Sequence, residues 1–314
     1  MLCRAPSRLL AFSSLIILTI AAPLSAQETR SETRFTVEKY LDMEQVGDPQ
    51  ISPDGSQIVY TRSRVDRLTD RWQPELWIMS ADGSRNRFLL RGSQARWSPD
   101  GTRILYVASP PGGDTASRPQ LFVRWMDAEG ATSQVTHVTQ SIGDAQWAPD
   151  GRSIGFTMFV PSRSDLRIDL PEAPRGARWT PAPRYIDRMH YRFDRRGFLE
   201  TGDRHIFVVP ADGGTPRQIT KGRWSVGYSM EGPAGGAGWD WAPDARTIVF
   251  DARDTTSSAS LAYRAGYIYA VDVNTGALRR ITAQRGPWSS PVVSPDGRRV
   301  AFRGFPEQRV SYRA

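Results

Sequence analysis

Short stretches in which apolar and polar residues alternate recur along this chain, each directly after a turn-forming tetrapeptide. The apolar members are Ile58 and Tyr60, Ile104 and Tyr106, Ile154 and Phe156, Ile248 and Phe250, and Val300 and Phe302. A two-residue period is typical of β-strands with one face in a core. A bulky apolar residue also precedes each tetrapeptide. The pattern therefore predicts that every copy is a hairpin with one buried face.

The tetrapeptide is Ser-Pro-Asp-Gly or a close variant, and it begins at Ser52, Ser98, Ala148, Ala242 and Ser294. Proline presets φ for the first central position, aspartate can bond its own backbone, and glycine accepts the positive φ that follows. In the fourth copy Ala245 replaces the glycine. We expect this turn to be the most strained of the five or to take another type.

A second strand-and-turn signature follows inside each complete copy, at residues 76–83, 121–130, 206–214 and 267–276. Two hairpins per copy make four strands, which is one propeller blade. The predicted fold class is all-β: an incomplete β-propeller of four-stranded blades with TolB-like or WD-like repeats, comprising four full blades and part of a fifth. The expected blades are residues 47–92, 93–142, 143–235, 236–288 and 289–314.

The third blade is expected to contain an insertion. The turn aspartates are separated by 46, 50, 94 and 52 residues, and only one second signature lies in the long interval. The insertion therefore spans about residues 161–204. Long loops in compact domains are often functional, and Arg188, Tyr191 and Arg192 could contact a peptide carbonyl or carboxylate. The alternative, which the sequence leaves open, is that the insertion only packs locally against the edge of its blade.

The two ends of the chain carry further expectations. Residues 1–26 have the charges, apolar run and small residues of a secretory signal, and residues 27–46 form a lead-in segment. An exported protein, periplasmic or extracellular, without stable membrane association after cleavage is predicted, with an uncleaved anchor as the alternative. The fifth copy stops 18 residues after Asp296. An unfinished blade leaves sheet exposed, so we expect the front part of a longer protein.

The composition of the chain excludes several kinds of site and partner. Cys3, the sole cysteine, lies in the predicted signal, so the mature protein would have no disulfide, cysteine nucleophile or thiolate metal site. The formal charge of +8 falls to +6 after cleavage, because Arg4 and Arg8 are removed. The arginines are scattered among acidic residues. The sequence shows no stripe of basic residues and no nucleic-acid-recognition motif, so no nucleic-acid partner is expected.

No catalytic residue, metal site or cofactor site is predicted within the chain. Gly151–Gly155 match the Gly-x-Ser-x-Gly pattern, but Ser153 follows a turn and enters a strand rather than a helix. His137, His190 and His205 are too widely spaced for a zinc site, and they are expected on the surface or packed in strands. The glycine-rich segment 232–238 lacks the Lys-Ser/Thr of a phosphate loop.

Three stretches, Val46–Gly55, Ile186–Arg192 and His205–Gly214, resemble the propeller of prolyl-oligopeptidase-family serine peptidases, in particular secreted bacterial acylaminoacyl-peptidase and dipeptidyl-aminopeptidase-like enzymes. The resemblance implies a propeller that caps an α/β-hydrolase domain and admits short peptides to a Ser-Asp-His triad. That domain is absent from this chain, which should be inactive alone. The chain has no Glu-Glu pair, which argues against the dipeptidyl-peptidase-IV-like subgroup.

The predicted function is therefore substrate gating for an exported serine peptidase, with peptide substrates reached through the missing hydrolase domain. The alternative is a TolB-like periplasmic propeller that acts as a protein-binding scaffold. Sequence beyond the codon for Ala314 separates the two, because only the peptidase requires further blades and a true nucleophile elbow.

Overall fold

The computed structural model describes residues 35–112, 118–162, 171–180, 183–186, 191–194, 197–227, 238–254 and 266–306. The chain divides into two compact units, residues 1–43 and 44–314. In the first, helix α1 (Val37–Leu41) starts at the N-cap Thr36, whose hydroxyl accepts a hydrogen bond from the Lys39 amide at 3.3 Å. The predicted signal, residues 1–26, lies outside the described residues. Within the described ranges no helix has the length and apolar character needed to cross a membrane.

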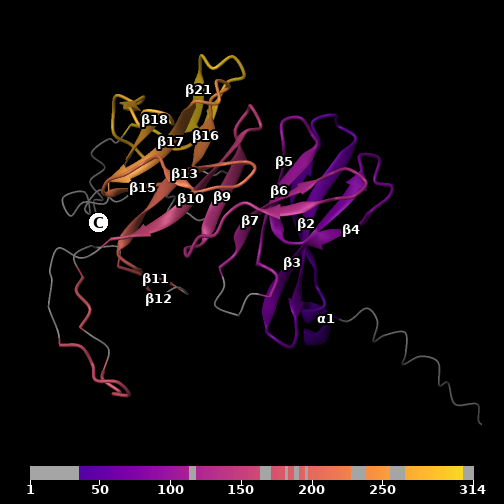
Figure 1. Ribbon diagram of the computed structural model, residues 1–314, viewed down its shortest axis with the longest axis horizontal. Coiled ribbons are helices and arrows are strands. Elements are labelled where there is room, and N and C mark those ends of the chain that lie inside the picture. Colours follow the sequence, from indigo (N-terminus) through magenta and orange to yellow (C-terminus); the bar gives the residue numbers. More distant parts are fainter. Residues whose placement is uncertain are drawn as a thin grey trace, which may run out of the picture. The chain divides into compact units, whose positions relative to one another are not determined.

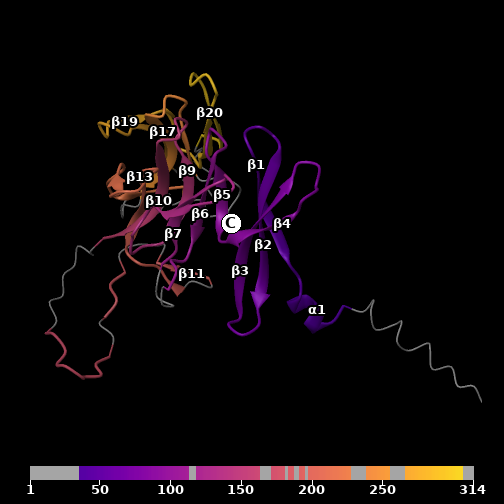
Figure 2. The same cartoon turned by 45° about the vertical axis from the view of Figure 1, so that its right-hand side comes forward.

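The described part of the second unit is built from antiparallel strands that form successive sheets (Figures 1 and 2). The first sheet has the order β1 (Gln45–Ile51), β2 (Gln57–Asp66), β3 (Arg71–Ser80) and β4 (Arg87–Arg91). The second has the order β5 (Ser93–Trp97), β6 (Arg103–Ala108), β7 (Gln120–Trp125) and β8 (Thr132–Gln134). Each of these sheets is an up-and-down meander, as a propeller blade is.

The third and fourth sheets contain the longer connections. The third has the order β9 (Ile142–Trp147), β10 (Ser153–Pro161), β13 (Gly202–Pro210) and β14 (Arg217–Gln218). The fourth joins β17 (Thr247–Asp254), β18 (Gly266–Asp272) and β19 (Leu278–Arg280), and both β15 (Trp224–Val226) and β16 (Trp239–Trp241) pair with β17. β15 therefore lies within the range expected for the third blade but pairs with the fourth sheet.

Two small sheets complete the described strands. β11 (Arg192–Phe193) pairs with β12 (Gly197–Phe198) inside the expected insertion, and β20 (Ser289–Val293) pairs with β21 (Val300–Arg303). The structure thus confirms an all-β, propeller-type fold with four larger sheets and a two-stranded fifth among the described residues.

The tetrapeptide turns are as predicted. The Gly55 amide donates to the Ser52 carbonyl at 2.8 Å, and the equivalent bond closes each of the other turns. The glycine φ angles lie between 66° and 73°. Ala245 takes the same conformation, with φ of 52°, and its closing bond is 3.1 Å long. The fourth turn therefore keeps the common type and places a non-glycine residue in the left-handed region, where the Cβ is crowded.

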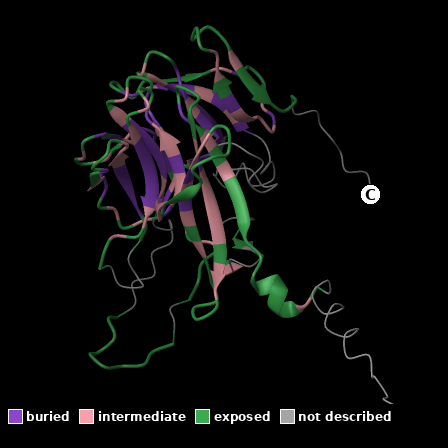
Figure 3. Ribbon diagram, turned by 90° about the vertical axis from the view of Figure 1, so that its right-hand side faces the viewer, coloured by how far each residue is buried: buried purple, intermediate pink, exposed green. Residues whose placement is uncertain are grey.

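The prediction of one buried face per hairpin is wrong for the inner copies. In β6, Ile104 and Tyr106 pack with the first sheet, while Leu105 and Val107 on the opposite face pack with the third. All four residues are buried. Stacked sheets cover both faces of the strands between them, and buried residues accordingly gather along these strands in Figure 3. Alternation shows which residues share a face but does not show whether the second face is covered.

Candidate functional site

The strand that precedes each tetrapeptide has an irregular backbone conformation at the same position in every copy. Four residues before the turn, φ becomes positive at Asp48, Gln94, Asp144, Gly238 and Ser290, with values between 50° and 70°. The pairing register of β1, β5, β9 and β20 slips there. These are β-bulges, which change the direction in which neighbouring side chains point. The bulges are the local cause of the pocket described next.

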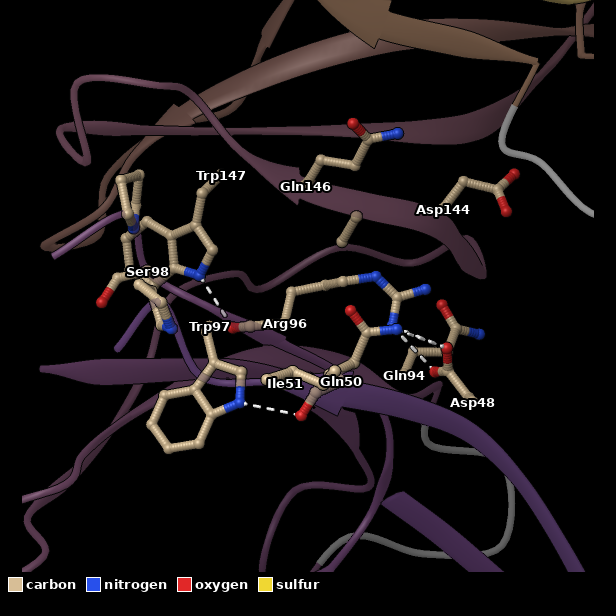
Figure 4. Close-up of a pocket in the computed structure, with 13 residues that line it drawn as sticks. Asp48, Gln50, Ile51, Gln94, Arg96, Trp97, Ser98, Asp144, Gln146 and Trp147 are labelled. Atoms are coloured by element: carbon tan, nitrogen blue, oxygen red, sulfur yellow. Dashed lines mark hydrogen bonds and ion pairs between the residues drawn. The ribbon is translucent and has the colours of Figure 1, made fainter. Parts of the chain in front are cut away.

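A pocket of about 750 Å³ lies along β1, β5 and β9 (Figure 4). Each strand contributes the residue at its bulge and the residue two positions further on. These residues are Asp48 and Gln50 from β1, Gln94 and Arg96 from β5, and Asp144 and Gln146 from β9, and Ser98 in the turn after β5 also lines the pocket. Ile51, Trp97 and Trp147 provide apolar surface in the same pocket. Concave sites with a few placed polar groups are the usual form of a ligand site.

An ion pair connects the first two strands of the pocket. Nη1 of Arg96 lies 3.0 and 2.8 Å from the two carboxylate oxygens of Asp48. The Gln50 side chain also donates to Asp48, at 3.1 Å. About a third of each charged side chain is exposed, 33% for Arg96 and 32% for Asp48. Solvent therefore weakens the attraction, and the pair mainly orients the two side chains.

Asp144 has a different environment. Burial raises the pKa of its carboxyl, and the Arg204 guanidinium, whose Nη1 is 3.6 Å from Oδ2, opposes that rise. A hydrogen bond from Thr157 acts in the same direction as Arg204. Because burial is the largest influence, Asp144 accepts a proton more readily than an ordinary aspartate.

Indole hydrogen bonds join the sheets behind the pocket. Trp97 Nε1 donates to the Gln50 carbonyl at 3.1 Å, and Trp147 Nε1 donates to the Arg96 carbonyl at 3.0 Å. The equivalent Trp241 Nε1 is buried, and no described residue accepts a hydrogen bond from it. In its place, the Gln146 side chain donates to the Trp239 carbonyl at 3.1 Å. Each sheet is thus bonded to the one before it near the pocket.

None of the described residues of the insertion lines this pocket. Arg188 lies outside the described residues. Tyr191 is exposed and packs on Phe198, with ring centroids 6.1 Å apart, and Arg192 pairs with Phe198 across β11 and β12. The Arg184 guanidinium lies 4.3 Å from the centre of the Phe198 ring. These contacts are local, and the role of Arg188, Tyr191 and Arg192 in substrate contact stays a prediction.

The other singled-out residues occupy ordinary positions. Ser153 begins β10 and pairs with Pro210 of β13, as a strand residue does. His137 is exposed, whereas His205 is buried against Thr220 and Trp224, and burial lowers its pKa. His190 and residues 232–237 lie outside the described part of the chain. Within that part, no three His, Cys, Asp or Glu side chains are grouped as metal ligands.

The pocket residues were missed by the sequence analysis. The available signal was a fixed offset: polar residues stand four and two positions before the turn in the first three copies, at Asp48 and Gln50, Gln94 and Arg96, and Asp144 and Gln146. Alignment of the copies on their turns would have found it. Strand periodicity alone could not, because a bulge breaks the two-residue period.

Comparisons with known proteins agree with this architecture. Residues 182–303 match the family model of the dipeptidyl peptidase IV N-terminal region. Dipeptidyl-peptidase 5 of Porphyromonas endodontalis is 27% identical over 94% of this chain and 42% of its own length. The uncharacterized peptidase YuxL of Bacillus subtilis is 27% identical over 68% of this chain and 31% of its own length. This chain therefore spans less than half of each of these relatives.

Among solved structures, an acylaminoacyl peptidase of Pyrococcus horikoshii is similar in fold, with a TM-score of 0.61 and 18% identity. The match covers 86% of this chain and 37% of that one. The matched range 182–303 contains no adjacent glutamates. The match does not test whether this chain lies outside the dipeptidyl-peptidase-IV-like subgroup, which stays a prediction. The relatives, the family model and the propeller-type sheets together support an N-terminal propeller part of a prolyl-oligopeptidase-family peptidase as what this chain is similar to.

Proposed function

We propose that this chain is the substrate-gating propeller of an exported serine peptidase that cleaves short peptides. The observation that carries the proposal is a pocket with polar groups on the first strands of three successive sheets of a peptidase-type propeller. The names of the relatives, dipeptidyl-peptidase and acylaminoacyl peptidase, support short peptides as substrates. The proposed enzyme would carry its catalytic residues on an α/β-hydrolase domain.

Gating would follow from closure of the propeller into a ring in the intact enzyme. The described sheets are joined by apolar clusters and by indole hydrogen bonds between neighbours, so a wall built from such sheets would resist deformation by a bulky substrate. An extended peptide is narrow enough to pass where a folded domain is not. In the intact enzyme, the propeller would select substrates by size, and the hydrolase domain would supply the nucleophile and its base.

The test compares this chain with the complete product of its gene. The complete product is expected to hydrolyse short peptide p-nitroanilides and to leave folded proteins intact. The 314-residue chain is expected to hydrolyse neither, and Ser153→Ala should leave the activity of the complete product unchanged. A complete product that cleaves no peptide but binds specific envelope proteins would overturn the proposal in favour of the TolB-like scaffold.

We also propose that the protein is exported. The support is the basic start, apolar run and small residues of positions 1–26, which are typical of a cleaved secretory signal. The mature protein would then meet its peptides in the periplasm or outside the cell.

A further inference from the structure

We propose that the pocket on β1, β5 and β9 binds the uncharged main chain of a peptide, and that Gln94 is a specificity-determining contact. The inference rests on the proposed function and deepens it, because it names the part of the substrate that this pocket recognises. Three observations carry it: the backbone conformation of Gln94, the balance of charges in the pocket, and the hydrogen-bonding groups that remain available there.

Gln94 is held in an unfavourable backbone conformation. Its φ is 56°, in the left-handed region that favours glycine. The equivalent position in the fourth sheet is Gly238, so the bulge itself requires no side chain. Gln94 is half-buried and lines the pocket. The same conformation occurs at Asp48 and Asp144, which also line the pocket, and at Ser290, which is not among its lining residues. Strained residues often occur at binding sites, where the side chain has a use that offsets the strain.

Each carboxyl group of the pocket has a cationic neighbour. Asp48 is paired with Arg96 within the pocket, and Asp144 lies near Arg204, which is not one of the residues that line the pocket. In Figure 4 the Arg96 side chain runs between Gln146 and Asp144 on β9 and Asp48 on β1. A ligand with a single positive or negative terminus would be attracted by one member of each pair and repelled by the other. A neutral polar ligand meets no such conflict.

The available hydrogen-bonding groups are of both kinds. No described residue hydrogen-bonds the Gln94 side chain, and the described partners of Gln50 and Gln146 engage only their side-chain nitrogens. The three amide oxygens can therefore accept, while Gln94 Nε2 and the outer edge of the Arg96 guanidinium can donate. A peptide main chain carries one donor and one acceptor per residue. A carboxylate offers only acceptors and an ammonium only donors, so neither matches this set.

The test removes the Gln94 amide without disturbing the bulge. In Gln94→Gly the side chain is lost, and the backbone conformation becomes more favourable, so the variant is expected to fold. Arg85→Gly is the matched control, because Arg85 also has a positive φ, 54°, and is exposed outside the pocket. The probe is acetyl-tetraalanine amide, titrated into the full 314-residue chain by calorimetry, beside the uncapped tetraalanine.

We expect saturable binding of the capped peptide, and an affinity for the uncapped peptide within about twofold of it. Gln94→Gly should weaken binding about fivefold, as the loss of one uncharged hydrogen bond does, and Arg85→Gly should leave it unchanged. The inference is overturned by an absence of saturable binding, by unchanged affinity in Gln94→Gly, or by a preference of more than tenfold for the uncapped peptide, which would indicate recognition of a terminal charge.

The two proposals fail separately. If the complete enzyme cleaves short peptides while this chain does not bind the capped peptide, only the pocket assignment is wrong. If this chain binds the capped peptide through Gln94 while the complete product cleaves no peptide, the proposed peptidase function is wrong.

Discussion

Ala245 shows how a single residue can be strained and still be tolerated. Its φ of 52° is unfavourable for any residue with a Cβ. The methyl group, however, is half-buried against the apolar cluster that includes Trp241 and Ile248. Burial of part of a methyl group offsets part of the backbone strain. The other four turns have glycine and no such compensation.

The compensation can be tested at Gly55. A Cβ there would contact nothing within 4 Å, and φ is 73°, so Gly55→Ala adds backbone strain without packing. We expect a loss of about 1 kcal/mol in the free energy of unfolding, measured by urea denaturation. Gly47→Ala is the control, because its Cβ would also meet open space and its φ lies outside the left-handed range. An equal loss in the two variants would contradict the explanation.

Asp54, the aspartate of the first turn, has a lowered pKa. The Ser52 hydroxyl, followed by the Ser56 amide and hydroxyl, lowers the pKa of Asp54 to about 2. The folded-state pKa lies below the unfolded value of 3.8. The stabilisation is therefore present above about pH 4 and is lost as the pH falls towards 2.

Ser52→Ala removes the largest of these contributions. We expect the pKa of Asp54 to rise towards 3.8, followed by carboxyl-carbon NMR titration. Asp82 provides the internal reference, because its pKa is lowered chiefly by the Ser84 hydroxyl and should not change. If Asp54 keeps its low pKa in Ser52→Ala, the hydroxyl is not the cause.

At the scale of elements, the sheets are joined by packing and by indole hydrogen bonds. Trp147 and Trp241 occupy equivalent positions, and both are buried, with 7% and 5% of their surface exposed. Only Trp147 has an acceptor among the described residues, the Arg96 carbonyl. A comparison of Trp147 with Trp241 therefore separates the contribution of the hydrogen bond to stability from that of the packed indole ring.

Trp147→Phe is expected to lower the free energy of unfolding by about 1 kcal/mol more than Trp241→Phe does. Both substitutions remove similar volume from a packed interface, but only the first breaks a hydrogen bond between sheets. Guanidinium denaturation of the two variants measures the difference. Equal losses would show that the indole bond adds nothing to packing.

At the scale of the whole molecule, the proposed export makes a direct prediction. Cleavage after Ala26 would leave Gln27 as the first residue and reduce the formal charge from +8 to +6. Intact-mass measurement of the protein recovered from the envelope of a Gram-negative host should show this form. Full-length protein retained in the membrane fraction would instead support the uncleaved anchor.

Local sequence was sufficient for the turns and for most strands of this molecule. Pro53, Asp54 and Gly55 determine a turn within four residues, and Ile104 and Tyr106 share a face whatever surrounds them. These features depend on backbone preferences and on neighbours in the chain, and repetition of the motif made the propeller architecture predictable.

Tertiary packing decided the rest. Arg96 pairs with Asp48, a residue 48 positions earlier, only because the first two sheets stack with their bulges in line. Both faces of β6 are buried only because sheets lie on either side of it. Contacts between sheets depend on how one sheet docks on the next, which no local period encodes. The pocket is the product of that docking, and the same residues in an isolated hairpin would not form it.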